Sequence, residues 1–161
     1  MKNKYLYMNK RFLDSLNSLK SATINFKESV NYCSLYSTQQ ELLDNFIIND
    51  IKIEIKLSIR SLEDLIIKLH SICVLLLNPE NSENITNIYN NCYLTFQLKN
   101  ADYGNSFVDF GLIGIIVRIN DKINRLKKIT VTTPNIINEK IEDTLMDLIN
   151  YTIISHLIIN E

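Results

Sequence analysis

The stretch that decides the fold is FVDFGLIGIIVRINDKINRLKK, which occupies residues 107–128. Its apolar residues recur at steps of three and four, the spacing of one face of an α-helix. The sequence Thr132-Thr133-Pro134-Asn135 then breaks the pattern, and a second helical pattern covers residues 136–159. The sequence therefore predicts two long helices, packed antiparallel and joined by a short turn.

Helical patterns also precede this pair. An apolar stripe begins near Phe12, cap-like sequences start at Thr38 and Ser61, and Ser82 can cap a helix that ends at the turn 102–104. Residues 51–59 also alternate with the period of a strand, but a helix is favoured because few turn residues lie nearby. With only 3 Gly and 2 Pro in the chain, we predict a single all-α domain over residues 1–161, a helical bundle with short connections.

Composition narrows the class of protein. The chain has 161 residues, a net charge of −1 and 46% hydrophobic residues, which is ordinary for a soluble globular domain and gives no reason to expect direct nucleic-acid binding. The N-terminal sequence has no apolar segment of a signal peptide, and the longest apolar run, at 72–77, is too short to span a bilayer. The 3 cysteines lack metal-site spacing and read as buried thiols. We therefore expect a cytoplasmic protein without a membrane segment.

The glycines are the strongest local signal, because all three lie between residues 104 and 114. Two of them fall inside the first long helical pattern, where each costs about 1 kcal/mol relative to Ala. They share one predicted helix face with charged residues at steps of three and four; the set is Gly111, Gly114, Arg118, Asp121, Lys122 and Arg125. Such a face would let a ligand approach the backbone and meet cations suited to phosphate oxygens. The alternative is that the glycines allow close helix packing and the charges are solvated.

The second long helix carries an acidic arc opposite its apolar arc. The arc consists of Glu139, Glu142, Asp143, Asp147 and Asn150. Like charges four residues apart are unfavourable by a few tenths of a kcal/mol, roughly, and a bound cation would reverse that sign. Mg²⁺ prefers oxygen ligands of this kind. Alternatively, Glu139 and Glu142 occupy the first turns because the helix dipole favours anions there.

Two other features admit a structural interpretation. Asp102-Tyr103-Gly104 can be a simple helix-ending turn, although Tyr103 could stack on a base and Asp102 could bind a sugar or a metal. His70 and His156 lie on apolar helices without a Ser or Cys partner at motif spacing, and we predict that they are core or surface residues.

Three blocks, in order, closely resemble the nucleotide modification associated domain (type one) family found in phages. They are KNADYGNSF at 99–107, GLIGIIVRINDKINRL at 111–126 and EDTLMDLINY at 142–151. The resemblance covers about residues 85–158 and leaves 1–80 as N-terminal helices of unknown role. That family is thought to be related to the all-α, MazG-like NTP pyrophosphohydrolases. The resemblance thus implies a MazG-like bundle that acts on a (deoxy)nucleoside triphosphate with Mg²⁺, in phage nucleotide metabolism or DNA base modification, and that forms a dimer.

On this interpretation, each candidate residue receives a role. Asp121, Asp143 and Asp147 would hold the metal, and Glu139 or Glu142 would assist catalysis. The phosphate-binding residues would be Lys99, Arg118, Lys122 and Arg125. The base and sugar would meet Asp102, Tyr103, Gly104, Gly111, Gly114 and Asn150.

The sequence departs from the MazG-like pattern in one respect. Those enzymes usually carry Glu-x-x-Glu on one helix and Glu-x-x-Asp on the next, whereas here the first helix offers only Asp121 and the second has shifted spacing. The metal ligands would then be fewer, or a second subunit would supply some of them. The alternative function is a non-catalytic helical module that sequesters a nucleotide or binds a host protein.

Overall fold

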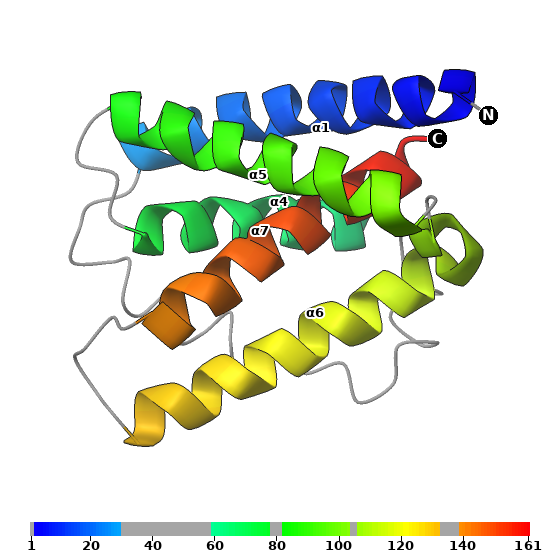
Figure 1. Cartoon of the computed structure of the whole chain (residues 1–161). Coiled ribbons are helices and arrows are strands. Elements are labelled where there is room, and N and C mark those ends of the chain that lie inside the picture. Colours follow the sequence, from blue (N-terminus) through cyan, green and yellow to red (C-terminus); the bar gives the residue numbers. More distant parts are fainter. Residues whose placement is uncertain (1, 30–58, 78–81, 104–105, 133–138) are drawn as a thin grey trace.

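The computed structural model describes residues 2–29, 59–77, 82–103, 106–132 and 139–161 (Figure 1). Every regular element in these ranges is an α-helix, so the predicted all-α bundle is confirmed. The elements are α1 (Lys2–Ser29), α4 (Ile59–Leu76), α5 (Ser82–Tyr103), α6 (Ser106–Thr132) and α7 (Glu139–Ile159). None of these helices has the length and apolar character needed to cross a membrane. The competing helix and strand predictions for residues 51–58 lie outside the described residues.

The helix α7 is the central element of the bundle. It contacts α6, α4, α1 and α5, whereas α6 packs mainly against α7. In Figure 1, α1 and α5 lie side by side along the upper edge, α7 crosses the middle, and α6 forms the lower edge. The chain runs in opposite directions along α6 and α7, as predicted for the two long helices.

The predicted apolar stripes form the core. Phe12, Leu16 and Leu19 of α1 are buried, and so are Ile85, Tyr89, Cys92 and Phe96 of α5. The rings of Phe12 and Phe96 stack with their centroids 3.9 Å apart. These buried side chains pack α1 against α5, while α1 also contacts α4 and α7.

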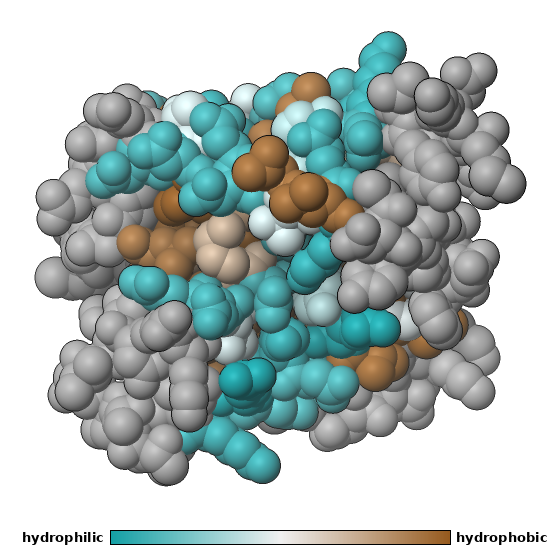
Figure 2. All heavy atoms as spheres, in the orientation of Figure 1, coloured by the Kyte–Doolittle hydropathy of each residue, from teal (hydrophilic) through white to brown (hydrophobic). Residues whose placement is uncertain are grey.

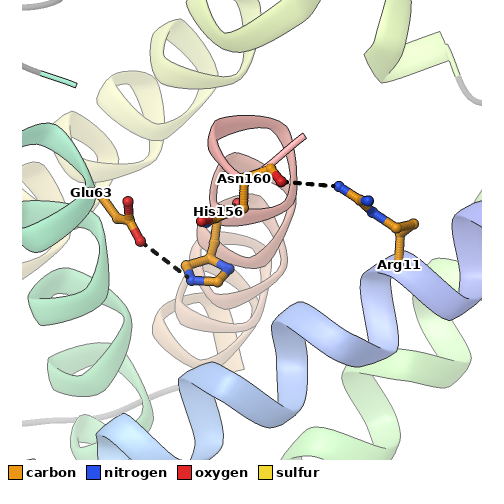
Figure 3. A network of polar contacts seen from close by, with 4 residues as sticks. All are labelled: Arg11, Glu63, His156 and Asn160. Atoms are coloured by element: carbon orange, nitrogen blue, oxygen red, sulfur yellow. Dashed lines mark hydrogen bonds and ion pairs between the residues drawn. The ribbon is translucent and has the colours of Figure 1, made fainter. Parts of the chain in front are cut away.

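Polar contacts from α1 and α4 hold the last turns of α7 (Figure 3). The Arg11 guanidinium donates a hydrogen bond to the Asn160 carbonyl oxygen at 3.3 Å. On the other side, His156 Nε2 lies 3.8 Å from Glu63 Oε1. Burial lowers the pKa of His156 below its ordinary value, and the nearby Glu63 carboxylate partly opposes that shift. The C-terminal end of α7 is therefore placed by the N-terminal helices.

Candidate functional site

The helix α6 is interrupted at Gly111. This residue has φ 65° and ψ −167°, a conformation that is open almost only to glycine. A Cβ built there would have no atom within 4 Å, so the backbone conformation, and not crowding, explains the glycine. We had expected Gly111 and Gly114 to share a face of one regular helix. That expectation was wrong for Gly111, which lies at the kink, whereas Gly114 lies in the helical segment that follows.

Beyond the kink, α6 presents a basic flank, which we define as Arg118, Lys122 and Arg125. Their spacing of i, i+4 and i+7 places them within an arc of about 60°. Arg118 and Arg125 are exposed, and Lys122 is half-buried beside α7. The surface over α6 is mostly hydrophilic in Figure 2, apart from an apolar area, and Ile113 and Val117 are exposed on this helix.

The facing part of α7 carries a matching acidic flank, which we define as Asp143, Asp147 and Asn150. These residues have the same i, i+4 and i+7 spacing and again span an arc of about 60°. Asp143 is exposed, whereas Asp147 and Asn150 are half-buried. The apolar arc predicted for this helix is buried on its other side, through Leu145 and Leu148 among others.

One ion pair joins the two flanks. Lys122 Nζ lies 2.8 Å from Asp147 Oδ2, and their side chains are 24% and 33% exposed. Because α6 and α7 are antiparallel, this pair shows how the two helices are aligned. It places Arg125 at the level of Asp143 and Arg118 at the level of Asn150, each to within one residue or about 1.5 Å. The structure thus aligns the two flanks along one edge of the α6–α7 pair.

Asn150 contributes an unused hydrogen-bond acceptor to this edge. Its Oδ1 atom is buried and has no hydrogen-bond partner within the described part of the chain. A buried polar atom without a partner costs about 1–3 kcal/mol. Because the atom is buried, a ligand group could donate to it only after the neighbouring side chains moved aside.

Other candidate residues lie away from the paired flanks. Asp121 is exposed and lies about 100° around α6 from Lys122, so Lys122, and not Asp121, supplies the contact to Asp147. Glu142 is exposed and lies about 140° around α7 from Asp147. Lys99 is exposed on α5.

Several predicted contacts fall outside the described residues. The side chains of Asp102, Tyr103 and Glu139, and the whole of Gly104, belong to this group. The predicted end of the preceding helix is confirmed, because α5 ends at Tyr103.

A metal site would need several carboxylates, histidines or cysteines close together. Among the described residues, no group of three or more His, Cys, Asp or Glu side chains is placed to hold a metal ion. The acidic flank offers Asp143 and Asp147, and the second of these is already paired with Lys122. The described residues alone therefore do not complete a site for Mg²⁺.

A buried polar network, which the sequence did not predict, lies on the opposite side of α7. We define the core network as Thr23, His70, Ser71, Tyr89 and Thr152. The His70 ring is 2.8 Å from Thr152 Oγ1 through Nδ1 and 2.7 Å from the Tyr89 hydroxyl through Nε2. Thr23 Oγ1 lies 3.0 Å from the same hydroxyl and 3.2 Å from Ser71 Oγ.

Burial controls the chemistry of this network. His70 is fully buried, so of the two positions that the sequence left open, core or surface, it occupies the core. Burial, with a smaller contribution from the nearby His156, lowers the pKa of His70 to about 3. Burial also raises the pKa of the Tyr89 phenol above its ordinary value. Both side chains are consequently neutral at physiological pH.

A known protein family matches the part of the chain that holds both flanks. Residues 99–159 match the family model of the nucleotide modification associated domain 1. This match confirms the resemblance for α6 and α7 and leaves α1, α4 and most of α5 outside the matched domain. No curated protein and no solved structure matched the chain. The relation of this domain to MazG-like enzymes therefore stays a prediction.

Proposed function

We propose that this protein binds the phosphates of a nucleoside triphosphate along the paired flanks of α6 and α7. The observation that carries the proposal is the Lys122–Asp147 ion pair, because it aligns the basic flank with α7 inside the matched domain. The exposed guanidinium groups of Arg118 and Arg125 suit phosphate oxygens, which they can bind in a bidentate manner. Asn150 Oδ1, which is buried and has no partner among the described residues, would accept a hydrogen bond from the base or sugar if ligand binding opened this edge.

The reaction that we propose for this site is hydrolysis between the α- and β-phosphates, as the family resemblance implies. Mg²⁺ would offset phosphate charge and lower the pKa of an attacking water. Asp143 and Asp147 would be its ligands on α7. Because the described residues provide no larger group, and Asp121 and Glu142 lie away from the flanks, further carboxylates would come from Glu139 or from a second copy in a dimer.

The small number of carboxylates grouped among the described residues favours a second candidate function, binding without turnover. A site that has only two carboxylates on one flank can hold a nucleotide through its cations without activating water. The protein would then sequester a nucleotide, or present it to a host protein, in nucleotide modification.

A direct screen separates the two functions. Purified protein is incubated with each common dNTP and NTP and Mg²⁺, and pyrophosphate and phosphate are measured separately, while calorimetry measures binding. We expect Arg118→Ala and Arg125→Ala each to weaken binding about tenfold, equivalent to about 1.4 kcal/mol. Lys68→Ala removes an exposed charge of α4 and is the matched control. Unchanged binding by both arginine variants would remove the basic flank from the site.

The metal role is tested at Asp143. This residue is exposed, so Asp143→Asn should change the stability of the ligand-free protein by less than about 0.5 kcal/mol. It should abolish the additional stabilisation that Mg²⁺ gives in the presence of a dNTP mixture, because a ligand stabilises only the state that it binds. Thermal melts with and without Mg²⁺ make the comparison. A variant that still responds fully to Mg²⁺ would exclude Asp143 as a ligand.

A further inference from the structure

The core network joins the N-terminal helices to α7. Thr23 belongs to α1, His70 and Ser71 to α4, Tyr89 to α5 and Thr152 to α7. Each of these residues is at most 2% exposed. Polar groups buried to this degree are costly unless their hydrogen bonds are complete. The relative positions of four helices therefore depend on a few hydrogen bonds.

His70 links α5 to α7 through its two ring nitrogens. Nδ1 lies 2.8 Å from Thr152 Oγ1 on α7, and Nε2 lies 2.7 Å from the Tyr89 hydroxyl on α5. The Thr152 hydroxyl also donates to the Ile149 carbonyl oxygen at 2.8 Å, which holds it against its own helix. Because a neutral imidazole has one donor and one acceptor nitrogen, the buried ring can bond to both helices at once.

The position of this bridge on α7 relates it to the paired flanks. Thr152 follows Asp147 by five residues, which is about 7.5 Å along the axis and about 140° around it. The helix α7 is thus held on one side by His70 and meets Lys122 on the other. A rotation of α7 by about 20° would move a side chain at a radius of 5–6 Å by about 2 Å, which is enough to separate the Lys122–Asp147 pair.

We propose that His70 is a positioning residue for the α6–α7 site, which it controls by fixing the rotation of α7 through Thr152. This assigns a role to the helices that lie outside the matched domain. They hold the acidic flank at the angle at which Asp147 reaches Lys122. The importance of this angle for ligand binding rests on the proposed function, but the geometric effect can be measured without a nucleotide.

The test removes one hydroxyl and then measures a distant interaction. Thr152→Val deletes the group that faces His70, and Thr152→Ser retains it as the matched control. In each background, urea unfolding of Lys122→Met, Asp147→Asn and the double variant gives the coupling energy of the ion pair. We expect the coupling to be present in the parent and in the Ser background, and lost in the Val background. His70→Phe removes the same hydrogen bond from the α4 side and replaces Thr152→Val if that variant does not fold.

A merely structural network would give a different result. Stability would then fall in the Val background, but the coupling between Lys122 and Asp147 would persist, and this would overturn the proposal. Coupling absent from the parent protein would also overturn it.

Inorganic triphosphate serves as the ligand probe for the same variants. Weaker binding by Thr152→Val but not by Thr152→Ser supports the proposal, and equal binding by the two opposes it. If the parent protein does not bind triphosphate, the proposed function fails, while the coupling measurement still decides the role of His70.

Discussion

Lowering the pH should destabilise this protein through a single buried residue, His70. The ring is fully buried, and its pKa is lowered from 6.5 to about 3 in the folded protein. In the unfolded chain the ring regains its ordinary pKa, so below pH 6.5 the unfolded state binds a proton that the folded state does not. The contribution of His70 to the free energy of unfolding is therefore greatest above pH 6.5 and falls as the pH decreases through the window from 6.5 to about 3. Below about pH 3 it does not change further, because the ring is then protonated in both states.

The size of this effect follows from the width of the window. Each pH unit of separation between the two states corresponds to about 1.4 kcal/mol. Lowering the pH from 6.5 to 4 should thus remove about 3 kcal/mol through His70. Because small domains are stable by only about 5–15 kcal/mol, the loss is large enough to measure easily. The lowered pKa of His156 acts in the same direction, but this side chain is only partly buried and should contribute less.

The assay is urea unfolding at pH 7, 6, 5 and 4, followed by circular dichroism. The wild type is compared with His70→Gln, which keeps a side chain with both a donor and an acceptor but cannot take up a proton. His156→Gln is the matched control for the other histidine. We expect the stability of His70→Gln to fall much less with pH than that of the wild type or of His156→Gln. Parallel pH curves for all three proteins would refute the inference that His70 is buried as a neutral ring.

Three other predictions concern stability and reactivity. Tyr89→Phe should lower the free energy of unfolding by about 1–3 kcal/mol, because it leaves His70 Nε2 and Thr23 without the phenol hydroxyl; a neutral change in urea unfolding would contradict the network. Gly111→Ala should cost about 1–3 kcal/mol in the same assay because of the positive φ, although its methyl group meets no atom within 4 Å; an unchanged midpoint would mean that α6 straightens freely. Cys73 and Cys92 are buried with thiol pKa values raised to about 12, so a disulfide reagent should modify them only as fast as the protein unfolds, and rapid labelling of either native thiol would show that the core opens.

Local patterns were sufficient to predict the helices and their buried faces. Apolar residues at steps of four and three, such as Ile85, Tyr89 and Cys92, identify a helix and the side that it buries, because both depend only on neighbours in sequence. The predicted cap at Ser82 and the end at Tyr103 agree with α5. The helix α4 already includes Ile59, so the cap-like Ser61 lies inside the helix and does not begin it.

The candidate site was predictable as a pair of helix faces, but not in its contacts. Spacing placed the cations of α6 opposite the acids of α7, yet it could not show that Lys122, and not Asp121, meets Asp147. The sequence indicated that glycines inside a helical pattern lower its stability, but it did not predict the kink at Gly111. The core network was not predicted because its partners, such as His70 and Thr152, are 82 residues apart and have no local signature.

The central place of α7 has a practical consequence for any excised fragment. The matched domain begins at residue 99, so a fragment cut there would lack α1, α4 and most of α5, which cover α7 on the side away from α6. Leu145, Ile149 and Ile153, all buried in the whole chain, would face water as one continuous apolar strip. Exposed strips of this kind favour self-association. We expect such a fragment to aggregate or to recruit another apolar helix, so the unit that folds is larger than the unit that the family match delimits.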